Sequence, residues 1–587
     1  MTRDPAETGP APHIERGLAV PMCDGAVLRA DLWLPCPAPA GPLPVLICRT
    51  PYGRSADPDE QRFARTAVAR GYAVLMQDVR GRHDSEGDFE PHVHEGRDGF
   101  DSIEWAAAQG WCDGRAGTFG LSYPGCAQWL AALEAPPHLL ALAPAMSYAR
   151  LREAIRYGGV FDADWVRWAY LSMAPERRRR HGLPGPQTEA EAWDEWQRQG
   201  EDAFLGHLPL AEVADLRHTA PFFGQWLAQP QHSPWWDFGD VAERLGVVTA
   251  AVLNLDGWLD DACGPKGAIA NHLGLCAARA EEPEPRSRLI LGPWGHGIPA
   301  VTGQRAPGGR DFGPQAFLDY DALVLDFMDR HVRGLNDAQD QTPRVCYFVM
   351  GENRWREADT WPPHTRELCL HLHAAAENGA GENGAGETGG LSGEPPAQAQ
   401  ESGFVNDPAR PVREISAWTQ GPADQRALLE MERGRLLAFE TGPLPENLYV
   451  VGNIRAELCV SLDAPDADLC LLVQDVAPDG AAYALMDPRA GALRLSSTGG
   501  PLAPGEVRRV SISTLLTANT FLKGHRIRLV VCASWHPALA RNLQSGEDEA
   551  FSSASRPARI TLHHGPQHQS RLLLPIAAAG TLSTAKG

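Results

Sequence analysis

The stretch RAGTFGLSYPGCAQW (residues 115–129) decides the fold of this chain. A short apolar run ends at Gly120, Ser122 follows two residues later, and the pattern after Gly125 is that of a helix. A serine at such a strand-to-helix turn has two interpretations. It is either the N-cap of the helix, a position that serine often occupies, or a nucleophile held clear of its strand. The rest of the sequence has to decide between them.

The segments around this turn alternate between strand and helix patterns. Short apolar runs typical of buried strands occupy residues 43–48, 72–78, 117–120 and 139–147. Helix-like stretches occupy residues 61–69, 99–109 and the segment after Ser122. This alternation predicts an α/β domain, in which a parallel sheet carries helices on both faces.

The pattern changes at about residue 148. Residues 148–240 are rich in Trp, Arg, Glu and Ala and lack strand-like runs, which predicts a helical cap inserted into the sheet domain. Strand-like runs return at 247–255 and 288–291, followed by a helix near 315–332. We therefore expect the α/β domain to comprise residues 1–147 and 241–335.

From residue 343 to 587, short alternating segments are separated by turn residues, a pattern typical of an antiparallel sandwich or jelly roll. Residues 374–400 are rich in Gly, Ala and Glu and cannot form a core, so we expect a mobile surface loop there.

Composition excludes several classes of protein. The net charge of −21, from 53 basic and 74 acidic residues, argues against a nucleic-acid partner. The basic run Arg177–Arg180 is the exception, and we interpret it as a solvated loop. No window reaches the ~20 apolar residues of a membrane span, and the first residues show no secretory signal. Twelve cysteines without C-x-x-C spacing are typical of a cytoplasmic protein.

Two polar groups follow later strands in the order that a nucleophilic serine needs. Asp260 and Asp261 follow the strand-like run ending near residue 255, and His296 follows the run 288–291. In α/β-hydrolases the order is Ser, then Asp or Glu, then His, with each residue beyond its own strand. The usual serine motif is G-x-S-x-G, and here the second glycine comes one residue late.

Taken together, these features resemble the cocaine esterase (CocE/NonD) family of serine hydrolases and its relatives, the X-Pro dipeptidyl-peptidases. The family motif G-x-S-Y-x-G is satisfied by residues 120–125. Other stretches similar to family signatures are residues 20–35, 49–54, 77–89, 110–120, 348–355 and 521–531. The resemblance implies an α/β-hydrolase core with a helical cap, followed by a C-terminal jelly-roll domain of the X-Pro dipeptidyl-peptidase type.

The resemblance also implies a role for individual residues. Ser122 would be the nucleophile, His296 the general base, and Asp260 the acid that orients the imidazole, with Asp261 as the alternative. The oxyanion hole would combine the backbone N–H of Tyr123 with the phenol of Tyr52, a donor suited to a developing negative charge. Trp168 is expected to line the acyl pocket, with a purely structural role as the alternative.

The function that the resemblance implies is hydrolysis of carboxylic esters, with amides as a second class, through an acyl-serine intermediate and with no metal or organic cofactor. An X-Pro dipeptidyl-peptidase and an α-amino-acid ester hydrolase are the enzymatic alternatives, and a carbohydrate-binding jelly-roll protein is the non-enzymatic one. The partners expected are small-molecule substrates, and the sequence is compatible with a homodimer. His92 and His94 form an H-x-H pair, but a metal site would need further ligands.

The natural substrate is not encoded in any motif. α-Amino-acid ester hydrolases bind the substrate ammonium with carboxylates placed two and three residues after the catalytic aspartate. Here those positions are Ala262 and Cys263, which predicts a preference for uncharged acyl groups. Asp162 and Asp164 could substitute for them, although we interpret both as solvated residues of a cap helix.

Overall fold

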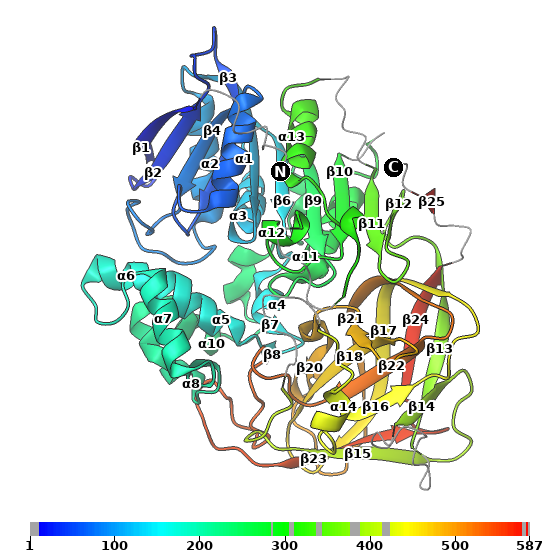
Figure 1. Cartoon of the computed structure of the whole chain (residues 1–587). Helices are drawn as coiled ribbons and strands as arrows, with labels where there is room; N and C mark the ends of the chain where they lie inside the picture. The colour runs from blue at the N-terminus through cyan, green and yellow to red at the C-terminus, as the bar shows by residue number, and fades with distance from the viewer. Residues whose placement is uncertain are drawn as a thin grey trace.

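A mixed sheet of eleven strands forms the N-terminal half of the protein (Figure 1). The computed structural model describes residues 11–282, 286–303, 310–335, 343–375, 388–413, 423–577 and 583–584. The strand order is β1-β2-β4-β3-β5-β6-β9-β10-β11-β12-β25, and every pair from β4 to β11 is parallel. The strands are β1 His13–Pro21, β2 Val27–Leu34, β3 Leu43–Thr50, β4 Ala73–Asp78, β5 Cys112–Leu121, β6 Leu139–Ala145, β9 Ala251–Gly257, β10 Ser287–Gly292, β11 Val345–Val349, β12 Arg354–Ala358 and β25 Ser583–Thr584.

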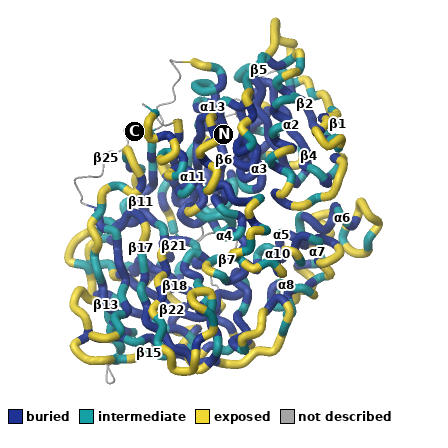
Figure 2. The backbone as a smooth tube through the Cα atoms, turned by 180° about the vertical axis from the view of Figure 1, so that it is seen from behind, coloured by how far each residue is buried: buried dark blue, intermediate teal, exposed yellow. Residues whose placement is uncertain are grey.

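Helices cover both faces of this sheet, as the alternating pattern predicts. Every residue of β4, β9 and β10 is buried, which is typical of parallel strands covered on both sides (Figure 2). Helices α1 (Pro58–Ala69) and α13 (Tyr320–His331) share one hydrophobic core. Helices α2 (Glu95–Ala107), α3 (Tyr123–Ala132) and α11 (Gly264–Ala278) contribute to the core on the other face, and α12 (Ile298–Val301) follows β10.

The segment between β6 and β9 is mainly helical and lies beside the sheet (Figure 1). Its helices are α4 Leu151–Ile155, α5 Asp164–Trp168, α6 Ala174–His181, α7 Glu189–Gln199, α8 Asp202–Leu205, α9 Leu216–Thr219 and α10 Pro221–Ala228. One short hairpin, β7 (Arg156–Tyr157) with β8 (Val160–Phe161), was not expected from the sequence. We refer to this segment as the cap.

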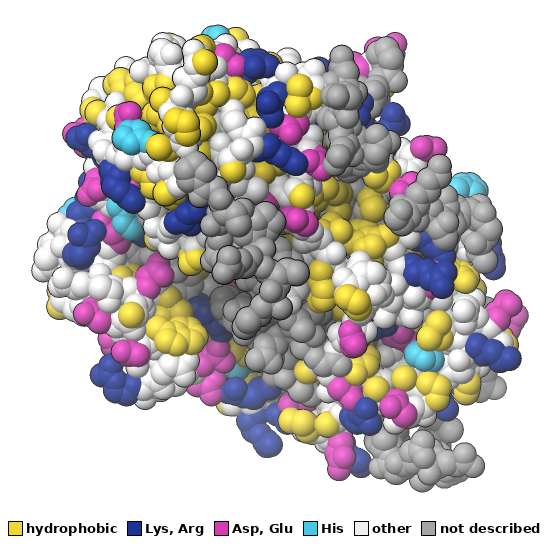
Figure 3. Space-filling model, turned by 45° about the horizontal axis from the view of Figure 1, so that its top comes forward, with side chains coloured by type: hydrophobic (Ala, Val, Ile, Leu, Met, Phe, Trp, Pro, Cys, Tyr) yellow, Lys and Arg dark blue, Asp and Glu magenta, His cyan; other side chains and the backbone are white. Residues whose placement is uncertain are grey.

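The expectation that Arg177–Arg180 forms a solvated loop is wrong about the loop and about Arg178. These residues belong to helix α6, in which Arg179 and Arg180 are exposed, while Arg178 is buried with its guanidinium 5.0 Å from the centre of the Tyr170 ring. A guanidinium is weakly hydrated and stacks on aromatic rings, so a basic run can be packed when rings and carbonyl groups face it. On the face shown in Figure 3, basic and acidic side chains are interspersed.

The C-terminal half is a β domain in which every strand pair except β14 with β16 is antiparallel. Its strands are β13 Thr365–His373, β14 Gly389–Ser392, β15 Gln400–Asn406, β16 Leu437–Glu440, β17 Leu448–Leu462, β18 Asp468–Val476, β19 Ala482–Ala484, β20 Ala492–Arg494, β21 Arg508–Phe521, β22 Arg526–Cys532, β23 Ala558–His564 and β24 Arg571–Ala577. Its described residues also include the short α-helix α14, Leu428–Met431. An α/β-hydrolase domain followed by a β domain is thus the observed fold.

The predicted loop at 374–400 is wrong in its second half. Residues 376–387 lie outside the described residues, but Gly389–Ser392 form strand β14 between β13 and β16. A Cβ on Gly389 would lie 2.4 Å from the carbonyl O of His373 and 2.6 Å from the Phe439 ring. Glycine is therefore what allows this strand to pack so closely, and a Gly-rich composition does not exclude a strand.

None of the helices in the described ranges is long and apolar enough to cross a membrane. The domain boundaries at residues 147, 240 and 335 stay predictions.

Candidate active site

Ser122 occupies the tight turn between strand β5 and helix α3. Its backbone angles are φ 67° and ψ −124°, and its side chain makes no capping hydrogen bond to the helix. Ser122 therefore occupies the N-cap position of α3, but its hydroxyl does not act as the cap. A non-glycine residue with positive φ is uncommon, and such strained conformations cluster at functional sites. The turn places Ser122 directly after the carboxyl end of a parallel strand, the edge at which α/β sheets bind ligands.

Two glycines make this turn sterically feasible. A Cβ on Gly120 (φ 134°) would lie 2.5 Å from the Cβ of Pro124, and one on Gly125 would lie 2.5 Å from the carbonyl O of Ala145. Both distances are well below the contact distance of about 3.5–4.0 Å for carbon atoms. The second glycine comes one residue late because the third residue of α3 is the one that approaches the end of β6.

Asp260 and His296 are brought together by two neighbouring strands. Strands β9 and β10 are parallel and paired up to Gly257 and Gly292, so the residues after both strands meet at one edge. There His296 Nδ1 lies 2.8 Å from Asp260 Oδ1. Among the described contacts, Asp261 makes no such bond to His296, so the geometry favours Asp260 over its neighbour as the orienting acid.

The electrostatics of this pair favour a charged aspartate beside a basic histidine. Burial disfavours the charged form of both groups, but their opposite charges and their hydrogen bond outweigh it. The pKa of His296 is raised from its ordinary value, with Asp261 adding to the effect, and the pKa of Asp260 is lowered. For Asp261 burial dominates and raises the pKa to about 7. The pKa of Asp260 is therefore lowered and that of its neighbour Asp261 is raised.

Tyr52 follows strand β3 and contacts the cap. The indole Nε1–H of Trp168, in helix α5, donates a hydrogen bond of 3.1 Å to the Tyr52 phenol oxygen. That oxygen still has its own proton to donate, because burial raises the pKa of Tyr52 above its ordinary value. Trp168 also stacks parallel to Trp226 at 6.0 Å. The sequence suggests Trp168 as a pocket residue or a structural one, and the structure adds a direct contact to Tyr52.

The Tyr123 side chain is held by a network that sequence analysis missed. Its hydroxyl donates to Glu95 (2.8 Å) and accepts from the backbone N–H of His92 (3.1 Å), while Glu95 pairs with Arg49 at 2.8 Å. The His92 ring stacks on Tyr123 with centroids 4.3 Å apart, and burial lowers the pKa of His92 to about 3. No motif marks Glu95. As the first residue of α3, Tyr123 has a backbone N–H without an intrahelical acceptor.

Metal ligation is not suggested for His92 or His94. Among the described residues there is no group of three or more His, Cys, Asp or Glu side chains that could hold a metal ion.

Asp162 and Asp164 are not the solvated cap residues expected from the sequence. Asp162 is buried, and both carboxylates pair with Arg489 of the C-terminal β domain, which is 1% exposed. Arg489 also pairs with Asp487 at 3.0 Å. Three carboxylates around one guanidinium satisfy its donors, as buried charges require. This contact, which joins residues more than 300 positions apart, cannot be found in a sequence pattern.

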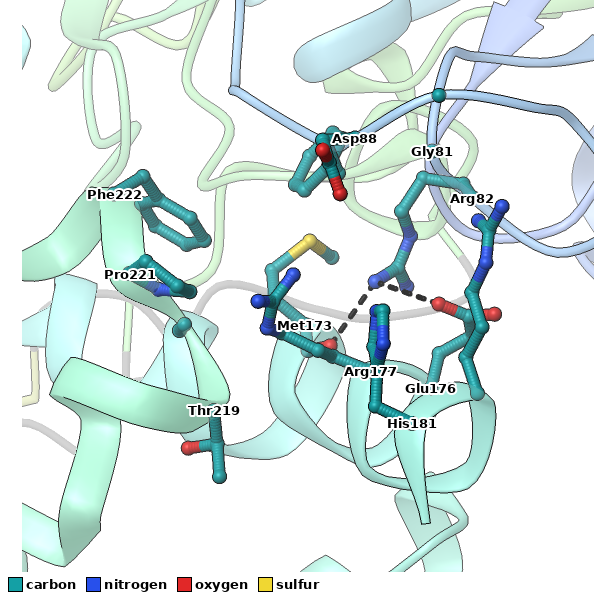
Figure 4. Close-up of a pocket in the computed structure, with 14 residues that line it drawn as sticks. Gly81, Arg82, Asp88, Met173, Glu176, Arg177, His181, Thr219, Pro221 and Phe222 are labelled. Atoms are coloured by element: carbon teal, nitrogen blue, oxygen red, sulfur yellow. Dashed lines mark hydrogen bonds and ion pairs between the residues drawn. The ribbon is translucent and has the colours of Figure 1, made fainter. Parts of the chain in front are cut away.

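A second cap contact surrounds a pocket between the segment 81–89 and helix α6 (Figure 4). The buried Arg82 donates to the carbonyl O of Met173 (3.0 Å) and pairs with Glu176 (3.7 Å), as the dashed lines mark. Arg180 donates to the carbonyl O of Ser85 across the same boundary. The family signature 77–89 therefore supplies the surface on which the cap rests, rather than reacting groups.

Comparisons with known proteins identify the family of this chain. The family model for the X-Pro dipeptidyl-peptidase (S15 family) matches residues 24–298, and the model for the X-Pro dipeptidyl-peptidase C-terminal non-catalytic domain matches residues 336–573. Cocaine esterase from Rhodococcus sp. (strain MB1 Bresler) is 32% identical over 599 residues, which cover 96% of this chain and 98% of that protein.

Two solved structures share the whole fold. An aminopeptidase from the marine sediment archaeon Thaumarchaeota archaeon superposes with a TM-score of 0.77 at 22% identity, over 97% of this chain and 96% of that one. An α-amino acid ester hydrolase superposes with a TM-score of 0.74 at 21% identity, over 98% of each chain. From the match to cocaine esterase over nearly the full length of both proteins, the chain belongs to the cocaine esterase (CocE/NonD) family of serine hydrolases and is an enzyme of the serine esterase type.

Proposed function

We propose that this enzyme hydrolyses carboxylic esters through a covalent acyl-Ser122 intermediate, with His296 as general base and Asp260 as the group that orients it. The observation that carries the proposal is the 2.8 Å Asp260–His296 hydrogen bond at the sheet edge where the strained Ser122 turn lies. A weak nucleophile needs such a base, and the base needs an orienting acid.

The reaction proceeds in two half-reactions of the same kind. The Ser122 Oγ attacks the ester carbonyl carbon while His296 takes the hydroxyl proton, and the tetrahedral intermediate then expels the alcohol, which receives that proton from His296. Water next attacks the acyl-enzyme as His296 takes its proton. Collapse of the second intermediate releases the carboxylic acid and returns the proton to Ser122. Asp260 remains ionised and stabilises the imidazolium at both stages.

The negative charge on the carbonyl oxygen needs donors that are already in place. The proposal assigns this task to the backbone N–H of Tyr123 and the phenol O–H of Tyr52. The contacts around Glu95 support it by fixing Tyr123. The hydrogen bond from the Trp168 N–H also supports it. The Tyr52 oxygen accepts this bond, so its own O–H is free to donate to the substrate oxygen.

Tyr52→Phe tests the phenol directly. The substitution keeps the ring and removes the O–H, so we expect kcat to fall about 10²–10³-fold with a modest change in KM, because the lost bond matters most to the oxyanion. Steady-state kinetics with a p-nitrophenyl ester measure it. Trp168→Phe, which removes the N–H that contacts the phenol, is the companion variant, and its loss should be smaller. Full activity in Tyr52→Phe would exclude the phenol from the oxyanion hole.

Acyl-group preference is a further prediction. Asp162 and Asp164 are both engaged by Arg489, so neither of these two carboxylates is free to bind a substrate ammonium group. We expect acetyl or benzoyl esters to have a higher kcat/KM at pH 7 than the matching phenylglycine ester. A strong preference for the free-amino substrate, abolished by Asp162→Asn or Asp164→Asn, would contradict this prediction.

A second candidate function is an X-Pro dipeptidyl-peptidase, favoured by the two family models named after that activity. A panel of p-nitrophenyl esters assayed beside Gly-Pro and Ala-Pro anilides separates the two functions. The esterase proposal expects turnover of the esters and little of the anilides, and the opposite ranking would replace it. A cytoplasmic location and a homodimer stay predictions.

A further inference from the structure

A third carboxyl group, that of Asp256, lies behind the Asp260–His296 pair and has no part in the mechanism above. Asp256 is near the end of strand β9, and its side chain, like that of Asp260, is fully buried. Asp256 Oδ1 accepts a hydrogen bond of 2.8 Å from the Gly257 N–H. Asp260 Oδ1 accepts one of 2.9 Å from the Ala262 N–H and faces His296.

The second oxygen of each group remains to be explained. Oδ2 of Asp256 and Oδ2 of Asp260 are both buried, and no N–H or hydroxyl group of the described residues donates to either. A tight turn separates the two residues, because the Asp260 N–H donates to the carbonyl O of Gly257 at 3.2 Å, and the two carboxyl groups interact with each other. Two neighbouring carboxylate anions would repel, and one of two carboxyl groups that share a site holds a proton. A single acid O–H between them would satisfy both buried oxygens.

The surroundings decide which group holds the proton. Asp260 faces His296 and accepts from backbone N–H groups, all of which favour its anion. Asp256 has no ion pair with a described Arg, Lys or His, and the negative charge of Asp260 disfavours a second anion beside it. Burial is the largest effect on Asp256 and raises its pKa well above the ordinary value.

We propose that Asp256 is a protonated positioning residue, whose acid O–H donates to Oδ2 of Asp260 and holds Oδ1 toward His296. A neutral donor fixes the aspartate without adding charge to the site, as hydrogen-bond partners behind a reacting group commonly do. A buried carboxylic acid kept neutral as a donor has precedent in enzymes. The inference rests on the proposed roles of Ser122, His296 and Asp260.

Asp256→Asn and Asp256→Ala form the test. The asparagine carbonyl can accept from Gly257 and its amide N–H can donate to Asp260, so we expect it to retain kcat within about threefold. The alanine variant has no donor and should lose about 10- to 100-fold in kcat with little change in KM, as expected when a hydrogen bond to a charged group is lost. Circular dichroism and thermal unfolding check that both variants are folded.

The pH profile of kcat/KM supplies a readout that packing alone would not change. If Asp256 is neutral, Asp256→Asn removes no charge and the acid limb stays where it is. If Asp256 were ionised, its replacement would lower the pKa of His296 and move the acid limb to lower pH. Infrared spectra give a second readout: the difference spectrum between the parent enzyme and Asp256→Asn should contain the carbonyl band of one buried carboxylic acid, over and above those of other buried carboxyl groups.

Three results would overturn the inference: a loss in Asp256→Asn as large as that in Asp256→Ala, a shift of its acid limb, or full kcat in Asp256→Ala. If the alanine variant does not fold, the kcat, the acid limb and the infrared spectrum of Asp256→Asn test the inference without it. Ser122→Ala, run in parallel, keeps the two hypotheses apart. If it retains turnover, the proposed function fails. If it is inactive while Asp256 variants are indistinguishable from the parent, only the role of Asp256 fails.

Discussion

Ser122→Ala and His296→Ala are each expected to lower kcat by about 10⁶-fold, and the double variant should be little worse than either single one. The reason is that both proton transfers of the histidine serve reactions of the serine: without Oγ no acyl-enzyme forms, so the histidine has no step to catalyse. Without the imidazole, the hydroxyl is a weak nucleophile at neutral pH. Single-turnover and steady-state kinetics with a p-nitrophenyl ester measure the three variants.

Ser147→Ala is the matched control, because Ser147 follows the next strand of the same sheet edge and its Oγ accepts only a structural hydrogen bond, from Trp129 at 3.2 Å. It should retain kcat within about tenfold while losing stability of the order of one hydrogen bond. Losses that multiply in the Ser122/His296 double variant would contradict the shared role of the two residues.

Asp260→Asn is expected to lower kcat by about 10⁴-fold, because an amide in place of the carboxylate favours the wrong imidazole tautomer while leaving the packing intact. The removal of the negative charge should also shift the acid limb of the pH profile, in a direction that can be predicted. Asp260 raises the pKa of His296, and the base is active only when neutral. In the variant the pKa of His296 falls, so the remaining activity should persist to lower pH than in the parent enzyme.

Asp261→Asn provides the comparison for this prediction. Its carboxyl group makes none of the described hydrogen bonds to His296, and its effect on the pKa of His296 comes after that of Asp260. We expect a much smaller loss of kcat and a small downward shift of the acid limb. A large loss in Asp261→Asn together with a small one in Asp260→Asn would exchange the two roles.

The fold was largely predictable because its elements are local. Apolar runs bounded by turns mark β3, β4, β6 and β10 to within a few residues, and burial on both faces explains why these runs are continuous. The position of the proposed reacting groups has a related reason. Parallel strands bring the residues after their carboxyl ends to one edge, so chain order suggested Ser122 with His296 and with Asp260 or Asp261, and the family resemblance favoured Asp260.

The supporting contacts were not predictable, because they depend on packing between distant segments. Arg489 meets Asp162 across two domains, and Trp168 meets Tyr52 across more than one hundred residues. Sequence patterns classified Asp162 as solvated and the basic run of α6 as a loop, since charge normally indicates exposure. In the structure Asp162 and Arg178 are buried. Asp162 is paired with Arg489, and Arg178 stacks on the ring of Tyr170.

Covalent labelling of the nucleophile tests the central claim most directly. A fluorophosphonate probe reacts with an activated serine hydroxyl, and digestion with mass spectrometry locates the modified residue. We predict stoichiometric label on the peptide containing Ser122, loss of ester hydrolysis in step with labelling, and no label in Ser122→Ala. Label on a different residue, or ester hydrolysis that persists in Ser122→Ala, would contradict the acyl-serine mechanism.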